Sequence, residues 1–172
     1  MWIVKLGGSL NEDALLPRWL SLLASEGAGR AVIVPGGGNF TNQVRLAQHR
    51  WGFNDSAAHY MAIMGMAQTA MMLTALEPRL ALAEQETEIH DHIADGRSVV
   101  WLPLNVARPG AGIQPGWDIS ADSLALWLAG RTAAEGTVLI KSCTVLPHLS
   151  LQEQVRLGVL DDRFPYMAAM VS

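Results

Sequence analysis

The chain has 172 residues, half of them hydrophobic, so it is long enough to bury the core of one domain, and we expect a single domain over residues 1–172. Charged residues make up only 16% of the sequence, and the formal net charge is -4 at pH 7. Binding to nucleic acid or to an anionic membrane surface is therefore disfavoured.

The cysteine content and the N-terminal residues favour a location in the reducing cytoplasm. The single cysteine, Cys143, excludes an internal disulfide, and we expect it to be a packed, inert thiol. The first residues, MWIVKLGG, lack the apolar segment of a secretory signal, and no stretch is apolar enough for a membrane span. The sequence therefore predicts a cytoplasmic protein with no membrane partner.

Two apolar runs that end at glycines predict buried strands near the start of the chain. Residues 2–6 precede Gly7 and Gly8, and residues 30–35 precede three glycines at positions 36–38. Between them, leucines recur at helical spacing over residues 13–25, which predicts an amphipathic helix that ends before Gly27.

Two helices are expected next, over residues 39–50 and 56–76. The second carries five methionines, and apolar residues surround much of its circumference, so we expect it in the core or in a homo-oligomer interface. Asp55 or Ser56 is expected to cap its start. His59, within this helix, fits a core or substrate-cleft histidine better than a catalytic base.

Residues 99–104 and 138–141 predict two further strands, with a helix over residues 121–129 between them. Strands that alternate with helices form parallel sheets covered on both faces. The predicted fold class is therefore α/β, a three-layer α/β/α sandwich with a mainly parallel central sheet.

Three polar segments are expected at strand ends, where open α/β sheets bind ligands. In the first, Lys5-Leu6-Gly7-Gly8-Ser9, glycines let backbone N–H groups approach a phosphate, and a lysine supplies positive charge. Taken alone, this segment also fits a simple turn that reverses the chain.

The second segment is Pro35-Gly36-Gly37-Gly38-Asn39-Phe40, whose N–H groups and helix dipole could face an anion. It matches neither GxGxxG nor GxxxxGK[ST], which disfavours a nicotinamide site and a Walker-type site. A ligand role is favoured over a steric one, because three consecutive glycines cost much chain entropy. Arg45, on the following helix, could reach an anionic acceptor or form a surface ion pair.

The third segment, residues 117–123, places Asp118 and Asp122 four residues apart around a helix start, hence on one face. The two carboxylates either cap the helix or have separate functions, in which one orients a lysine and the other binds a polar acceptor.

His90 and His92 are residue types that bind metal ions, but the HExxH spacing is absent, and a solvated helix end is favoured. No metal site is predicted.

Taken together and in this order, the KLGGS motif, the PGGGNF loop, the DISAD segment and a strand that ends near Lys141 resemble the amino acid kinase superfamily. The resemblance covers roughly residues 2–166. Residues 55–66 and 101–104 are similar to its small aminomethylfuran-methyl-phosphate kinases of methanofuran synthesis.

The resemblance implies an ATP- and Mg²⁺-dependent kinase that phosphorylates a small phosphomonoester. The most specific acceptor that it implies is aminomethylfuran phosphate. It implies that Lys5, Asp122 and Lys141 are catalytic, with Lys5 on the transferred phosphoryl group and Asp122 holding the lysines. The implied nucleotide-binding residues are Gly7, Gly8, Ser9, Lys141 and Ser142, and the implied acceptor-binding residues are Gly36, Gly37, Gly38, Asn39, Arg45 and Asp118.

The sequence departs from the family pattern at two places. Tyr166 follows Phe164-Pro165 where relatives have a lysine, and residues 141–145 replace the commoner Asp-Val-Asp-Gly turn. Both departures favour an alternative, a catalytically silent nucleotide-binding module of the same fold. A carboxylate kinase is the third hypothesis.

Overall fold

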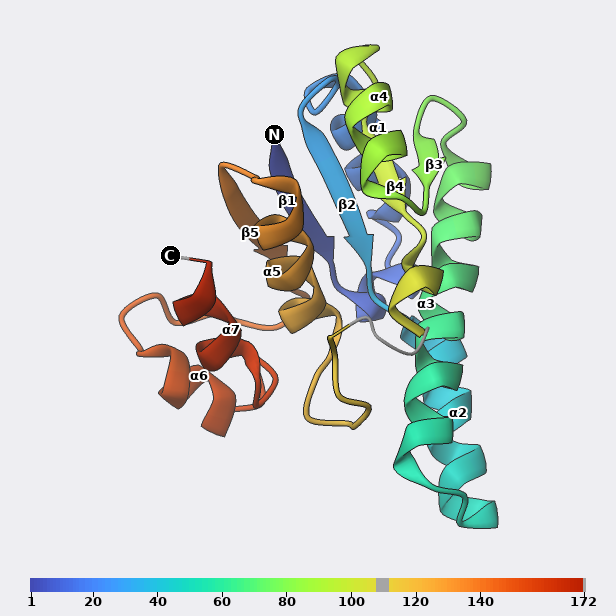
Figure 1. Cartoon of the computed structure of the whole chain (residues 1–172), viewed down its shortest axis with the longest axis vertical. Coiled ribbons are helices and arrows are strands. Elements are labelled where there is room, and N and C mark those ends of the chain that lie inside the picture. The colour runs from blue at the N-terminus through green and yellow to red at the C-terminus, as the bar shows by residue number, and fades with distance from the viewer. Residues whose placement is uncertain (108–111, 172) are drawn as a thin grey trace.

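The computed structural model describes residues 1–107 and 112–171, and a five-stranded sheet forms its centre (Figure 1). The strands are β1 (Trp2–Leu6), β2 (Ala31–Pro35), β3 (Ala81–Ala83), β4 (Val99–Trp101) and β5 (Gly136–Ile140). They lie in the order β3-β4-β2-β1-β5, and all four neighbouring pairs are parallel. The predicted α/β fold with a parallel sheet is confirmed.

Helices connect the strands and pack against the sheet (Figure 1). The helices are α1 (Leu16–Ser25), α2 (Gly38–Trp51), α3 (Asp55–Leu76), α4 (Glu86–Ala94), α5 (Ala121–Thr132), α6 (Leu151–Arg156) and α7 (Phe164–Met170), with short 3-10 helices η1 (Gly8–Glu12) and η2 (Pro103–Ala107). Among the described residues, no helix combines the length and hydropathy needed to cross a bilayer.

Side chains that alternate along the strands divide the core into two halves. Ile3 belongs to the half that packs against α4 and α5, and Val4 belongs to the half that packs against α1. α3 contributes to both, with Met66 in the first half and Leu73 in the second. Helices therefore cover both faces of the sheet, as the three-layer prediction requires.

Three boundaries differ from the sequence predictions for local reasons. The first helix begins at Leu16 rather than at residue 13, because η1 takes up residues 8–12. The strand expected over residues 99–104 ends at Trp101, since Pro103 has no N–H for a ladder and begins η2. The cap of α3 is Asn54, whose side chain accepts from the Ala57 N–H at 2.8 Å, and not Asp55 or Ser56.

The burial of Cys143 and of the methionines in α3 differs from the sequence predictions. Cys143 is exposed after β5, so the prediction of a packed thiol is wrong. The methionines of α3 divide between its two sides, because Met66 is buried against the sheet whereas Met64 and Met71 are about half exposed. One side of α3 thus belongs to the core and the other is an apolar surface.

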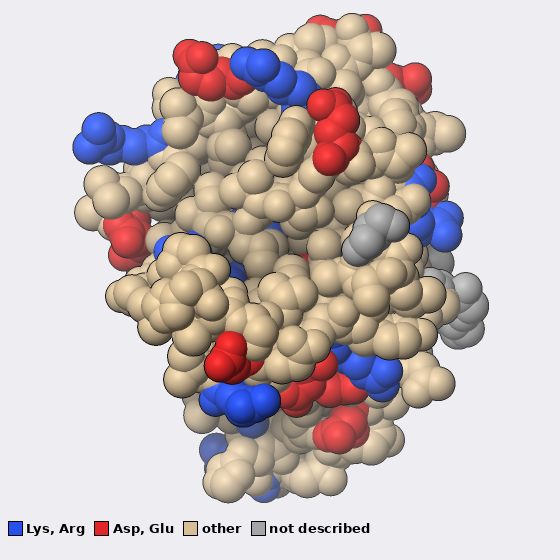
Figure 2. Space-filling model, turned by 90° about the vertical axis from the view of Figure 1, so that its left-hand side faces the viewer, with Lys and Arg blue, Asp and Glu red and all other residues tan. Residues whose placement is uncertain are grey.

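The face that carries β5, α6 and α7 has a broad uncharged area in its middle (Figure 2). Lysine and arginine side chains on this face are scattered rather than gathered into a patch (Figure 2). This distribution agrees with the low charged fraction of the sequence.

Candidate active site

The carboxyl ends of β1 and β5 lie side by side, and the chain leaves them in opposite directions. After β1 it continues toward β2, and after β5 it continues toward α6 on the other side (Figure 1). A crevice that binds ligands forms where neighbouring strands diverge in this way. Ser9 and Ser142, which follow the two strands, hydrogen-bond to each other at 2.6 Å.

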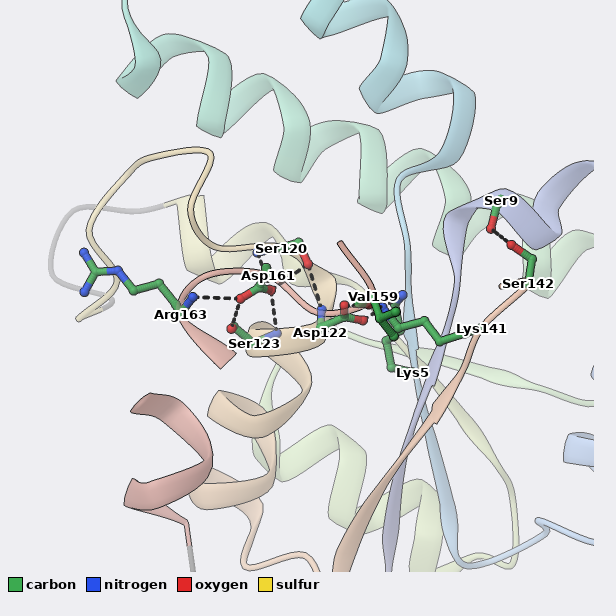
Figure 3. Close-up of polar contacts among 10 residues, drawn as sticks. All are labelled: Lys5, Ser9, Ser120, Asp122, Ser123, Lys141, Ser142, Val159, Asp161 and Arg163. Carbon is green, nitrogen blue, oxygen red and sulfur yellow. Dashed lines mark hydrogen bonds and ion pairs between the residues drawn. The ribbon is translucent and has the colours of Figure 1, made fainter. Parts of the chain in front are cut away.

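The chain contains only two lysines, Lys5 and Lys141, and both ammonium groups contact the carboxylate of Asp122 (Figure 3). Lys5 Nζ lies 2.8 Å from Asp122 Oδ1. Lys141 Nζ contacts Asp122 Oδ2 and also donates to the Val159 carbonyl. Lys5 comes from β1, Asp122 from the first turn of α5, and Lys141 directly follows β5, so the fold brings three distant segments together.

In the lysine cluster, Lys5 with Asp122 and Lys141, the first two residues are buried and Lys141 is partly buried. Lys5 is 6% exposed and Asp122 is 3% exposed. Burial lowers the pKa of Lys5 below its ordinary value, and the charge of Lys141 adds to this, while the ion pair with Asp122 opposes it. Two ammonium groups on one carboxylate leave an excess of positive charge, which suits a phosphate.

Asp161 fixes the start of α5, although no sequence pattern pointed to it. Its carboxylate accepts from the Ser120 N–H at 2.9 Å and from the Ser123 N–H at 3.1 Å, and it also bonds both hydroxyls (Figure 3). A carboxylate at a helix N-terminus satisfies free N–H groups and complements the helix dipole. Asp161 therefore holds the turn that carries Asp122.

The two glycine segments cross each other in direct backbone contact. A Cβ atom on Gly8 would overlap the backbone of Gly38, and one on Gly36 would overlap Gly8. The Gly7 N–H donates to the Ile140 carbonyl at 3.0 Å and the Gly36 N–H to the Leu6 carbonyl at 2.9 Å, so the sheet already uses these two donors. Glycine is needed here for close approach, a steric role that the sequence interpretation had ranked second.

A cleft of about 410 Å³ opens beside this crossing. Its walls come from the ends of β1 and β2, from α2 and α3, and from residues 116–124. The lining includes Lys5, Gly8, Ser9, Gly36, Gly37, Gly38, Asn39, Arg45, His59, Met66 and Trp117. Most of the predicted site residues thus border one cavity. Asp122 and Lys141 are outside its lining and are linked to it by the ion pair between Asp122 and Lys5.

Two predicted acceptor ligands already have partners in the protein. The Asn39 amide donates to Glu12. The Arg45 guanidinium lies 3.9 Å above the ring of Trp117. A cation over an indole face is a favourable contact, and it keeps Arg45 at the edge of the cleft.

Asp118 does not share a face with Asp122. It precedes α5 and forms an ion pair with Arg163 at 2.5 Å, and its backbone carbonyl accepts from the Arg163 N–H at 3.1 Å. The hydrogen bond from Arg163 lowers the pKa of Asp118, and the charge of Arg163 contributes further. The two carboxylates therefore have different tasks, because the chain turns between them before the helix begins.

Neither Tyr166 nor the histidine pair belongs to the lysine cluster. Tyr166 is 60% exposed on α7 and borders, with Arg163, a second cavity of about 260 Å³. His90 and His92 lie on α4, and nowhere in residues 1–107 and 112–171 do three or more His, Cys, Asp or Glu side chains gather closely enough to hold a metal ion.

Comparisons with known proteins agree with this geometry. Residues 1–143 match the model of the amino acid kinase family. The chain is 30% identical over 129 residues to the [5-(aminomethyl)furan-3-yl]methyl phosphate kinase of Methanocaldococcus jannaschii, a match that covers 74% of this chain and 59% of that protein. The chain thus spans about three fifths of the length of this curated relative.

Solved structures with low sequence identity share the fold. The uridylate kinase of Archaeoglobus fulgidus superposes with a TM-score of 0.70 at 18% identity, covering 99% of this chain and 86% of that one. The UMP kinase of Ureaplasma parvum gives 0.71 at 12% identity, with 98% and 84% covered. An isopentenyl phosphate kinase gives 0.56 at 16% identity, with 87% and 78% covered.

Proposed function

The chain belongs to the amino acid kinase family, and from this premise we propose that it transfers the γ-phosphoryl group of ATP to a small phosphomonoester. The observation that carries the proposal is the convergence of both lysines on Asp122 beside the glycine crossing. Aminomethylfuran phosphate is the proposed acceptor, because the curated relative bears the name of a kinase for that compound.

The proposed transfer needs no covalent enzyme intermediate. An oxygen of the acceptor phosphate forms a bond to the γ-phosphorus, the bond to the β–γ bridging oxygen breaks, and ADP leaves with that electron pair. Catalysis of this kind rests on positioning and on neutralising charge on the transferred group. Lys5 and Lys141 supply fixed positive charge, and Asp122 keeps both ammonium groups in place.

The cleft suggests a division between the two substrates. We place ATP on the side of β1 and β5, near Gly8, Ser9, Lys141 and Ser142, and the acceptor on the side of α2 and α3, near Gly36 to Gly38, Asn39 and Arg45. Gly7 contributes by its small size rather than by its N–H, which the sheet already uses. Asp118 would reach an acceptor only by leaving Arg163.

The residues present fit a magnesium ion that arrives with the nucleotide. The described residues hold no group of three candidate ligands, and the carboxylate of Asp122 is occupied by two lysines. Mg²⁺ in such sites takes most of its ligands from phosphate oxygens and water. Its contribution would be to neutralise charge on the phosphates.

Product formation tests the proposal directly. The purified protein is incubated with Mg-ATP and a panel of small phosphomonoesters that includes aminomethylfuran phosphate, and products are identified by mass spectrometry. We expect a diphosphate product whose rate falls about 100-fold or more in Lys5→Met, which removes the charge and keeps the aliphatic chain. Arg97→Ala, which removes an exposed cation before β4, is the matched control and should leave the rate unchanged.

Two other results would support the remaining hypotheses instead. Binding of ATP with no turnover on any acceptor would favour a silent nucleotide-binding module, and Tyr166→Lys would then be the variant to assay. An acyl phosphate trapped by hydroxylamine would identify a carboxylate kinase.

We also propose that the protein is a cytoplasmic homo-oligomer and that residues 1–172 act as one domain. The two halves of the core share one sheet, which supports a single unit. The exposed side of α3 presents Met61, Met64, Met71 and Leu76, an apolar surface suited to a second copy. Light scattering of the purified protein would give its mass in solution.

A further inference from the structure

His59 is a buried imidazole on α3 that borders the cleft. It is 4% exposed. Its Nδ1 lies 3.1 Å from the Gly116 carbonyl oxygen, whereas its Nε2 has no hydrogen-bond partner within residues 1–107 and 112–171. Buried polar atoms without partners are rare and destabilising, so this nitrogen points to a group that binds in the cleft.

The bond to Gly116 determines what Nε2 can bind. A carbonyl oxygen can only accept, so in the neutral ring Nδ1 carries the proton and Nε2 holds the lone pair. A bound molecule must then present an N–H or O–H group to Nε2. A phosphate dianion has no such donor and would place negative oxygens against the lone pair.

Contacts along α3 separate His59 from the glycine crossing. The Thr69 hydroxyl lies 3.4 Å from the Gly37 carbonyl, and a Cβ atom on Gly37 would lie 3.5 Å from Met66 Cγ, so the glycine segment lies beside residues 66–69. His59 precedes Met66 by seven residues, which is about 10 Å along a helix axis. In aminomethylfuran phosphate, the ammonium and phosphate groups are held apart by a five-membered ring with a one-carbon arm on either side. The distance between these two groups is comparable to that between His59 and Met66.

The side chains of Trp117, Arg45 and Asp118, near the Gly116 carbonyl that His59 contacts, already have partners. The Trp117 indole N–H donates to Gln48 Oε1 at 2.7 Å, the Arg45 guanidinium covers the Trp117 ring, and Asp118 pairs with Arg163. Nε2 of His59, in contrast, has no partner and belongs to a residue that lines the cleft, so its hydrogen bond is available to a ligand.

We propose that His59 selects acceptors by accepting a hydrogen bond from a donor, in the first place a primary ammonium, at the end of the molecule opposite to its phosphate. The proposal rests on the proposed function in taking a phosphomonoester as the ligand. It assigns His59 to recognition of the acceptor and not to proton transfer in the reaction.

Calorimetric binding of three matched compounds tests the proposal. They are [5-(aminomethyl)furan-3-yl]methyl phosphate and its two analogues in which hydroxymethyl or methyl replaces aminomethyl, each titrated in the presence of a non-hydrolysable ATP analogue. Wild-type protein should bind the amine on the order of 10- to 100-fold more tightly than the methyl compound, the range expected for a hydrogen bond from a charged donor. In His59→Leu this ratio should fall to about one, while affinity for the methyl compound stays within about threefold.

The possible outcomes distinguish recognition of the amine by His59 from a purely structural role of this residue. Equal weakening of all three compounds in His59→Leu, or equal binding of amine and methyl compounds by the wild type, would overturn the proposal. A hydroxymethyl compound that binds as well as the amine would support a neutral donor contact, and one that binds like the methyl compound would support a contact specific to the ammonium. Absence of turnover would count against the kinase alone, because these ratios come from binding.

A second variant and an NMR measurement distinguish a loss of recognition from misfolding of His59→Leu. His59→Gln retains an oxygen that can accept, so it should recover part of the preference for the amine. In wild-type protein, long-range ¹H–¹⁵N correlation of the imidazole should show an unprotonated Nε2 whose resonance moves when the amine binds and stays in place with the methyl compound. A protonated Nε2 in the free protein would contradict the assigned tautomer and with it the proposal.

Discussion

Lys5 lines the cleft and forms with Asp122 and Lys141 a cluster of full charges, the charged end, whereas His59 presents one nitrogen without a partner at what we call the neutral end. The charged end joins β1, β5 and α5, and the neutral end joins α3 to the segment around Gly116. Fixed charges suit a phosphoryl group, whose charge distribution changes during transfer. A neutral acceptor suits a part of the substrate that only has to be recognised.

The two ends should also differ in how much the fold depends on them. Both ammonium groups at the charged end pair with Asp122, and removing one partner of a buried ion pair leaves the other uncompensated. The neutral end holds no ion pair between buried groups, and the one hydrogen bond of His59 is the neutral contact with the Gly116 carbonyl, so we expect a smaller loss of stability there. Changes in stability at the two ends therefore test whether this contrast holds.

The largest effect is expected for Asp122→Asn. The buried ammonium group of Lys5 and the partly buried one of Lys141 lose their common carboxylate, so the free energy of unfolding should fall by about 3–5 kcal/mol. Because Asp122 raises the pKa of Lys5, its removal should also lower that pKa further below the ordinary value. Denaturant unfolding gives the first quantity, and the two signals of ¹³C-labelled lysine in an NMR pH titration give the second.

Asp91→Asn, which changes an exposed carboxylate on α4, is the matched control and should leave both quantities unchanged. A loss of less than 1 kcal/mol in Asp122→Asn, comparable to that of a surface pair, would show that the cluster is effectively solvated. The contrast between the two ends would then fail.

The charged end could be predicted from the sequence because its parts are local. Lys5 stands one residue before the end of an apolar run, and Asp122 stands at the start of a helical pattern, so strand-end and cap signals locate both. Fold class and sheet direction followed from the same alternation of strands and helices. The resemblance to a family then joined the separate motifs.

The neutral end could not be predicted in this way. His59 was placed in a helix, yet its pairing with Gly116 joins residues 57 positions apart through a segment without regular structure. Asp161 escaped prediction for the same reason, since a cap supplied from 38 positions away leaves no local pattern. β3 escaped because three residues are too short to show an alternation.

A smaller effect is expected for Asp161→Asn, which weakens the support of the charged end without removing the ion-pair partner of either lysine. The start of α5 loses a charged acceptor for the N–H groups of Ser120 and Ser123, so the free energy of unfolding should fall by about 1–2 kcal/mol, as for loss of an N-cap. Chemical denaturation of the variant beside Asp162→Asn, the exposed neighbour, measures the difference. Equal stability of the two variants would mean that Ser120 alone caps α5.

The smallest effect is expected at the neutral end, for Arg45→Met. The exposed guanidinium loses its contact with the Trp117 ring, so the free energy of unfolding should fall by about 0.5–1 kcal/mol, the range for an exposed cation–π pair. Arg50→Met is the matched control, because Arg50 lies at 4.9 Å over the exposed Trp51 on the same helix and should contribute less. Thermal and denaturant unfolding of both variants give the comparison. A loss of 3 kcal/mol or more in Arg45→Met would contradict the contrast between the two ends, because a change of that size is expected for breaking a buried ion pair and not for an exposed cation–π contact.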